Sequence, residues 1–222
     1  MNPTLFSALL IIVLACVIIF GWARLRPREV GLSTRGLVVG AMTMVGCWLV
    51  AQLLLVAAAA FAGDPLVPAG RVGERFTEVI AQALGTAPNE ELVFRGFLFV
   101  QLVLIARRFT TVRAAWSIGA LAAAIIFALG HLPQRWTNQD LHGTALVQDL
   151  VQLGWNGLML TLVYVRTGYL EVGIGFHALW NEPWPLVASP LGAGTANMIT
   201  QVAVILAWPY LRWPRAREGR AG

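Results

Sequence analysis

Residues 37–62 read LVVGAMTMVGCWLVAQLLLVAAAAFA, and none of these residues carries a charge. An α-helix needs about 20 consecutive apolar residues to cross the hydrocarbon core of a bilayer, so this stretch is long enough to span one. It ends at the turn signal Gly63-Asp64-Pro65. The stretch from Leu37 to Ala62 therefore predicts a transmembrane helix, and it makes a membrane protein the first hypothesis for the chain.

The composition of the whole chain supports this hypothesis. Of its 222 residues, 58% are apolar and 12% are charged, and the mean hydropathy is +0.70. Soluble proteins average about 25% charged residues, which excludes a soluble enzyme, and intrinsic disorder needs low hydrophobicity and high net charge. Cys16 and Cys47 both lie in apolar runs and cannot form a disulfide scaffold. The composition thus indicates a polytopic helical membrane protein.

Six other apolar stretches are long enough to be further spans. They are Leu5–Ala23, Pro88–Ala106, Ala114–Gly130, Ala145–Val165, Tyr169–Val187 and Ala193–Leu211. The fold class we predict is all-α, a bundle of about seven spans (six to eight) with the active site between helices, in a single integral membrane domain over residues 1–222. The semi-polar stretch Arg71–Leu84 has helical periodicity and is expected at the membrane interface, unless it continues from about Phe76 into the next span.

The arginines predict the orientation of these spans. All 16 basic residues are arginines, and most of them flank apolar runs. Twelve fall in the loops and tail on one side of the membrane, three on the other, and Arg95 lies within a span. Because cytoplasmic loops carry the arginine excess, we expect an integral protein of the bacterial plasma membrane, with its N-terminus outside and a short basic tail, 213–222, in the cytoplasm. The formal charge of +5 is then a topology signal, and nucleic acid is not an expected partner.

Three ionisable residues lie at the start of one predicted span. The segment reads Asn89-Glu90-Glu91-Leu-Val-Phe-Arg95, and a charge inside a bilayer is costly enough to make a functional role the first hypothesis. Glu91 and Arg95 are four residues apart on one helix face and can form an ion pair. Carboxylates also favour helix N-termini for structural reasons. Glu90 is rotated by about 100° from Glu91, so it can face another helix.

The chain has three histidines, and two of them lie in predicted spans. His131 ends the fourth span, and His177 lies in the sixth with Asn181 one turn later. Such side chains can simply hydrogen-bond neighbouring helices. A carboxylate that faces imidazoles in a cleft sheltered from water is also suited to activating a water molecule. We therefore expect Glu90 to face His131, since both lie toward the same membrane side.

Three further polar residues are expected to have no part in this site. Asp140 and His142 are predicted to lie in an exposed loop. Glu171 is predicted near a membrane end, where solvation explains a charge.

These residues form three motifs in a fixed order. They are Glu90-Glu91-x-x-x-Arg95, Phe127-x-x-x-His131 and His177-x-x-x-Asn181. The set resembles the signature of the CPBP family, the CAAX proteases and bacteriocin-processing enzymes, also called the Abi family of intramembrane proteases. The resemblance covers about half of the chain, and it marks residues 88–189 as the motif-bearing protease core.

The resemblance implies hydrolysis of a peptide bond in a membrane-embedded or lipid-attached substrate, such as a CAAX-like or leader peptide. It makes Glu90 the general base, with His131 positioning the water, and makes His177 and Asn181 the groups that stabilise the oxyanion. Glu91, Arg95 and Phe127 are supporting residues in this pattern. An older interpretation of the family is a metalloprotease, in which Glu90, His131 and His177 are the candidate ligands of a zinc ion.

Two other functions fit the same residues. One is a catalytically silent membrane protein, such as a self-immunity factor that binds a peptide toxin. It would not need to hydrolyse a peptide bond. A proton-coupled transporter also uses Glu, His and Arg inside the membrane, although the chain shows no internal repeat. The sequence leaves open the substrate, the cofactor and the oligomeric state. It also leaves open the face to which the cleft opens. Glu90 and His131 fall on the outer side, whereas the eukaryotic prenyl-protein proteases of the family open to the cytosol.

Overall fold

The computed structural model describes residues 12–210, and every regular element in this range is a helix. The elements are Ile12–Trp22, which ends in the π-helical stretch η1 (Val17–Trp22), the 3-10 turn η2 (Pro27–Val30), α2 (Thr34–Ala62), α3 (Val72–Leu84), α4 (Thr86–Glu91), the π-helical stretch η3 (Leu92–Phe99), α5 (Val100–Ala106), α6 (Val112–Thr137), α7 (Gly143–Thr167), α8 (Leu170–Asn181) and α9 (Ala193–Ala207). The predicted all-α fold class is confirmed. The beginning of the first predicted span, the end of the last one and the basic tail lie outside the described residues.

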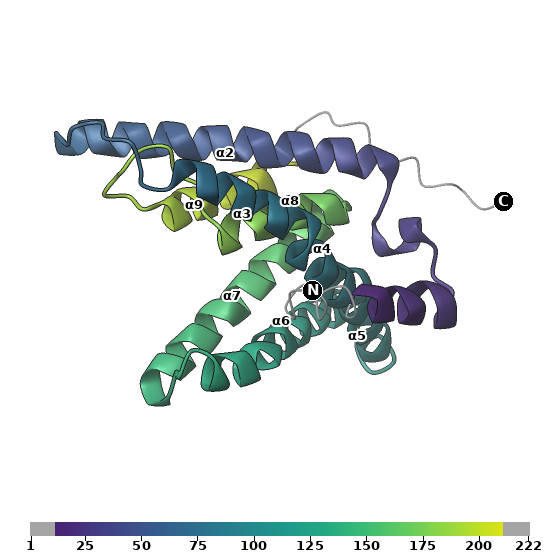
Figure 1. Ribbon diagram of the computed structural model, residues 1–222. Coiled ribbons are helices and arrows are strands. Elements are labelled where there is room, and N and C mark those ends of the chain that lie inside the picture. Colours follow the sequence, from purple (N-terminus) through teal and green to yellow (C-terminus); the bar gives the residue numbers. More distant parts are fainter. Residues whose placement is uncertain (1–11, 211–222) are drawn as a thin grey trace.

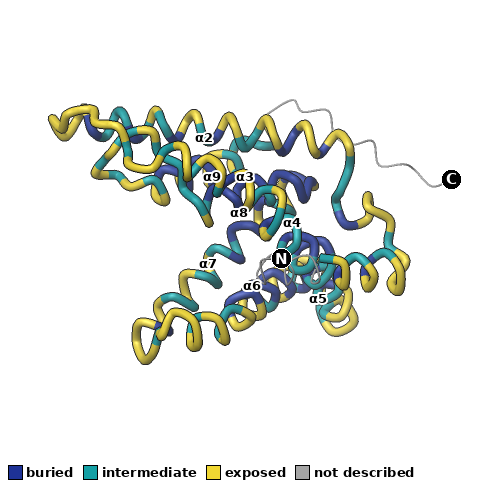
Figure 2. Tube along the Cα trace, viewed as in Figure 1, coloured by how far each residue is buried: buried dark blue, intermediate teal, exposed yellow. Residues whose placement is uncertain are grey.

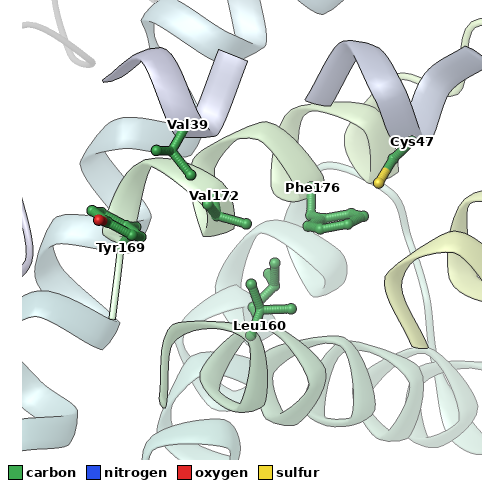
Figure 3. Packing of buried hydrophobic residues seen from close by; sticks show 7 residues of the cluster. Val39, Cys47, Leu160, Tyr169, Val172 and Phe176 are labelled. Carbon is green, nitrogen blue, oxygen red and sulfur yellow. The ribbon is translucent and has the colours of Figure 1, made fainter. Parts of the chain in front are cut away.

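Helix α8 is the centre of the fold. It contacts α2, α3, α4, α7 and α9, and Figure 1 shows it enclosed between the long helix α2 and the diverging pair α6 and α7. Nine of its 12 residues are buried. Val39 and Cys47 of α2 and Leu160 of α7 converge on Val172 and Phe176 of α8 (Figure 3). The apolar side chains of α8 are stabilised by this packing against neighbouring helices.

Helix α2 has an apolar surface on the side that no other helix covers. Small residues form the stripe that packs on α8, and a Cβ at Gly40 would lie 2.7 Å from the backbone of Glu171. Figure 2 shows exposed positions along α2, and Leu37, Met42 and Leu49 are among its exposed residues. A continuous apolar surface of this kind is unusual in water, and it is the surface that a lipid environment requires.

Within residues 12–210, two helical stretches are long and apolar enough to cross a membrane. They are Pro27–Ala62, most of which is α2, and α6. The other predicted spans correspond to helices in the described residues, but those helices are shorter or more polar. The count of about seven spans therefore stays a prediction.

Helix α9 ends at Ala207, earlier than predicted, and three helix ends closer to the motifs also differ from the prediction. Helix α6 continues past Gly130 to Thr137, so His131 lies inside the helix and does not end it. The extra turns are held by Arg135, whose Nε donates to Asp149 of α7 at 2.8 Å. Helix α8 ends at Asn181 instead of Val187, because prolines follow directly and cannot continue a helix.

The third difference is the break between α3 and α4. Gly85 has φ −117° and ψ −91°, which no α-helix contains. The alternative of one continuous helix from Phe76 is therefore wrong. The break lets α3 fold back along α8, which it contacts, while α4 enters the interior.

The prediction for Glu171 is also wrong. Its side chain is not solvated at a membrane end: the residue is only 5% exposed, and its Oε1 accepts the backbone N–H of Ser33 at 2.6 Å. The glycines of α2 allow this approach, since a Cβ at Gly36 would collide with the carboxylate. The prediction of an exposed loop is confirmed for Asp140 and His142, which pair with each other at 2.8 Å.

Candidate active site

Three segments that lie far apart in the sequence meet beside α8. The rod formed by α4, η3 and α5 supplies Glu90, Glu91 and Arg95, α6 supplies His131, and α8 supplies His177. Helix α4 packs on α8, and η3 packs on α6, α7 and α8. The π-helical winding of η3 begins directly after Glu91 and includes Arg95, and such winding is frequent at functional sites.

Glu91 and Arg95 form the predicted ion pair in the interior. Arg95 Nη1 donates to Glu91 Oε1 at 2.7 Å, and the two side chains are 1% and 0% exposed. Arg95 Nη2 donates to the carbonyl of Gly157 at 3.1 Å, and the guanidinium lies 4.6 Å from the centre of the Phe127 ring. A buried pair needs this many partners to offset its lost hydration. Arg95 therefore ties η3 to both α6 and α7.

His177 links this pair to the second glutamate. Its Nδ1 lies 2.7 Å from Glu91 Oε1, and its Nε2 lies 3.5 Å from Glu90 Oε2. Since a carboxylate can only accept, Nδ1 carries the proton in this contact. The nitrogen that faces Glu90 is therefore Nε2.

His131 faces Glu90 in the same way from the other side. Its Nδ1 lies 2.8 Å from the carbonyl oxygen of Phe127, which also can only accept. Its Nε2 is directed at Glu90 Oε2, at 3.8 Å. Both separations from Glu90 exceed a hydrogen-bond length, so the Glu90 carboxylate lies between two imidazole Nε2 atoms without bonding either.

Phe127 shapes the wall behind the two histidines. Its ring centre is 4.7 Å from that of His131 and 6.0 Å from that of His177, and the residue is 2% exposed. It also packs edge-on against Phe94 at 5.0 Å. The ring thereby restricts both imidazoles while it contacts Arg95.

Asn181 lies one turn above His177 at the end of α8. It is exposed, and its Nδ2 donates to Gln82 Oε1 of α3 at 3.0 Å. Among the described residues, its partner is thus on α3 rather than in the Glu90 cluster. The structure brings Glu90, Glu91, Arg95, Phe127, His131 and His177 into one connected group and places Asn181 at its edge.

Three consecutive residues of α4 each present a buried oxygen without a hydrogen-bond partner. The atoms are Asn89 Oδ1, Glu90 Oε2 and Glu91 Oε2. Buried polar atoms are almost always paired, and exceptions call for an explanation such as a bound water. Here the unpaired Glu90 oxygen is the one between the two imidazoles. The site has the acceptors to hold a water molecule that donates hydrogen bonds.

Comparison with known protein families finds a match for the segment that carries these residues. Residues 73–182 match the family described as type II CAAX prenyl endopeptidase, Rce1-like. Residues 73–182 form a domain of the Rce1-like family. The members of this family are integral membrane proteases, so the predicted resemblance is confirmed. No curated relative and no solved structure matches the chain.

The part of the chain that matches the Rce1-like family runs from the start of α3 to the residue after Asn181. It begins before residue 88, the predicted start of the protease core, and therefore includes α3. Helix α3 thus belongs to the family domain together with the helices that carry the three motifs.

The residues proposed as zinc ligands do not form a metal site. Within residues 12–210, no group of three or more His, Cys, Asp or Glu side chains is arranged to hold a metal ion. Nε2 of each histidine faces Glu90, but the remaining carboxylate nearby, Glu91, is committed to Arg95 and His177. We derive no step through a metal.

Several residues near the site were not singled out from the sequence. Gln82 and Asn89 have no pattern that separates them from ordinary helix-surface residues. Gly157 could have been found, because it lies in a span, where a small residue allows close packing. Its carbonyl accepts from Arg95, and a Cβ there would lie 3.1 Å from the Phe127 ring.

Proposed function

We propose that the chain is an intramembrane endopeptidase in which Glu90 activates the attacking water. The observation that carries the proposal is the unpaired Glu90 carboxylate between two imidazoles. Its side chain is 21% exposed while His177 is 4% exposed, so the carboxylate borders both the interior and an opening. A base needs this combination of access to substrate and shelter from bulk water.

The chemical step is a simple hydrolysis. Glu90 accepts a proton from the water while the water oxygen attacks the scissile carbonyl carbon. The carbonyl becomes a tetrahedral oxyanion, and the C–N bond then breaks as the proton passes from Glu90 to the leaving amine. The products are a new carboxylate and a free amino group, and the Glu90 carboxylate is restored.

The other residues act around this step. His131, whose Nδ1 is fixed by the Phe127 carbonyl, holds the water through Nε2. His177, whose Nδ1–H is fixed by Glu91, donates from Nε2 to the oxyanion when it is protonated, and Asn181 supplies a second donor from its amide. Glu91 and Arg95 hold the segment that carries Glu90.

We also propose a seven-span topology with the N-terminus outside and the C-terminus in the cytoplasm, in a single domain with residues 88–189 as its core. The arginine distribution supports this orientation. The substrate we propose is a lipidated peptide of the CAAX type, because the family is one of CAAX prenyl endopeptidases. In such a substrate the cysteine near the C-terminus carries the prenyl chain.

The test uses the purified chain in liposomes with a farnesylated peptide that ends in Cys-aliphatic-aliphatic-Ser. Mass spectrometry should detect release of the C-terminal tripeptide, and in ¹⁸O-water the label should enter the new carboxylate of the farnesylated fragment. A peptide without the lipid should be cleaved more slowly. Glu90→Gln should release nothing, while expression and thermal unfolding stay unchanged. Release by Glu90→Gln at the wild-type rate would contradict the proposal.

A metal assay completes this test. Wild-type protein is freed of metal with a chelator, and its residual metal is measured by mass spectrometry. On the glutamate mechanism, the metal-free protein keeps its full rate. If the metal-free protein loses cleavage and added zinc restores it, the mechanism needs revision. The protease assignment would still stand.

A further inference from the structure

Asn181 is poorly held by its own helix. It is the last residue of α8, and Glu182 leaves the helical conformation with φ −131° and ψ 82°. Its side chain is exposed. An exposed amide at a helix end samples several rotamers, and ordering it costs entropy. To direct an N–H at a reacting atom, the Asn181 amide therefore needs a contact with another residue that holds it in place.

Helix α3 supplies contacts to this end of α8 and to the residues that follow it. Gln82 Oε1 accepts from Asn181 Nδ2 at 3.0 Å. Arg75 Nη1 donates to the carbonyl of Pro183 at 3.0 Å, and Trp184 Nε1 donates to the carbonyl of Val72 at 2.9 Å. These α3 residues lie at helical spacing on one face, which packs on α8 (Figure 1).

Helix α2 holds the same segment from the opposite side. Trp48 Nε1 and Gln52 Nε2 donate to the carbonyl of Trp184 at 2.8 and 3.1 Å. The indole rings of Trp48 and Trp184 stack with centres 4.6 Å apart. On α3, Val79 is only 2% exposed and anchors the middle of the helix. The segment after Asn181 is thus fixed between α2 and α3, so Gln82 is a well-placed partner for Asn181.

We propose that Gln82 is a positioning residue that orients the carboxamide of Asn181 for oxyanion stabilisation. The proposal rests on the proposed function and extends it to a residue outside the three motifs. The Asn181 amide nitrogen carries two N–H bonds. One is donated to Gln82, which fixes the plane of the amide, and the other is left for the oxyanion. Helix α3 is then part of the catalytic apparatus, consistent with its place inside the family match.

The kinetic test is a double-mutant cycle on the farnesylated peptide with wild type, Gln82→Leu, Asn181→Ala and the double variant. Gln82→Leu should lower kcat about tenfold, as expected for one hydrogen bond, and leave KM unchanged. In the Asn181→Ala background, the same substitution should have no further effect. Thr77→Val is the matched control, because Thr77 is exposed on α3 and its hydroxyl bonds the backbone of its own helix. It should leave kcat unchanged.

Two kinetic results would overturn the proposal. The first is an unchanged kcat in Gln82→Leu. The second is an equal loss from Gln82→Leu with and without Asn181, which would make Gln82 a general brace of the fold. Neither result would contradict the proposed function, because that function is tested by the dependence of cleavage on Glu90.

A spectroscopic measurement tests the same contact without any substrate. In protein labelled with ¹⁵N-asparagine, the side-chain amide signals of Asn181 are assigned by their loss in Asn181→Ala. One of the two protons should be shifted downfield in wild type and in Gln82→Glu, which keeps an acceptor. In Gln82→Leu the shift should disappear. A signal that is the same in all three proteins would show that Gln82 does not hold Asn181.

Discussion

Glu171 and Glu90 each have one oxygen without a hydrogen-bond partner, but they differ in the groups that surround them. Glu171 lies at the start of α8, is 5% exposed, and accepts the backbone N–H of Ser33 at 2.6 Å. Glu90 lies on α4 with two imidazole Nε2 atoms at 3.5 and 3.8 Å and no hydrogen bond to either. The first carboxylate is bonded to a backbone group that cannot change its protonation. The second lies near two imidazoles, which can exchange protons.

If Glu90 is the base, as we propose, burial alone does not mark a catalytic carboxylate. Glu171 caps the N-terminal end of α2, a position where negative charge is favoured, and it fastens α8 to α2. On the proposed mechanism Glu90 serves turnover, because it lies near two imidazoles and makes no hydrogen bond to either. The substitutions below separate these two roles, beginning with the largest expected effect.

His177→Ala removes the side chain that contacts both glutamates of the site. Cleavage of the farnesylated peptide should fall about a thousandfold, the typical cost of losing an oxyanion donor. The initial rate of tripeptide release in liposomes checks this. His142→Ala is the control, since that histidine lies in the exposed loop, and this variant should cleave the peptide at the wild-type rate. Equal activity of both variants would remove His177 from the mechanism.

Arg95→Met breaks the buried ion pair and leaves Glu91 without its cation. The expected loss is about 3–5 kcal/mol of stability, as for other buried pairs with one partner removed. Thermal unfolding in detergent measures it. Arg113→Met, at an exposed position on α6, should unfold like wild type. If both variants were equally stable, Arg95 would not be the link between η3, α6 and α7.

Glu171→Ala leaves the buried N–H of Ser33 without an acceptor. We expect a loss of about 1–3 kcal/mol in the free energy of unfolding, because an unpaired buried donor is costly. Glu171→Gln keeps an acceptor and should lose less. Chemical denaturation in detergent distinguishes the two variants. An alanine variant as stable as wild type would show that the contact does not fasten α8 to α2.

Arg71→Gln removes an exposed pair and should have the smallest effect. Arg71 bonds Glu74 at 2.5 Å, and both side chains are 64% exposed. Solvent and salt screen such pairs strongly. The unfolding temperature and the cleavage rate should both equal those of wild type. A clear loss of cleavage would indicate that the start of α3 contributes to the site beyond its packing.

The sequence predicts the helices well and their ends less well. Long apolar runs mark α2 and α6 because a span must be apolar throughout. The end of α6 was missed because the extra turns depend on Arg135 reaching Asp149 on another helix, which no local pattern reveals. The burial of Glu171 was missed for the same reason, since it depends on close approach to the glycines of α2.

The site was predictable where its residues follow helical spacing or a family motif. The Glu91–Arg95 pair follows from spacing alone, and it is present. The convergence of Glu90, His131 and His177 needed the motifs, because three helices have to meet. Gln82 was not predictable, since its contact with Asn181 arises only when α3 folds back at Gly85.

The central claim is that cleavage depends on Glu90 and not on every shielded carboxylate. Two isosteric substitutions in one assay test it most directly. Glu90→Gln and Glu171→Gln are reconstituted in the same liposomes, and kcat/KM is measured on the farnesylated peptide. We predict that Glu90→Gln loses at least about a thousandfold, while Glu171→Gln stays within about threefold of wild type, less than 1 kcal/mol of barrier. Cleavage by Glu90→Gln at the wild-type rate, or an equal loss in both variants, would contradict the account.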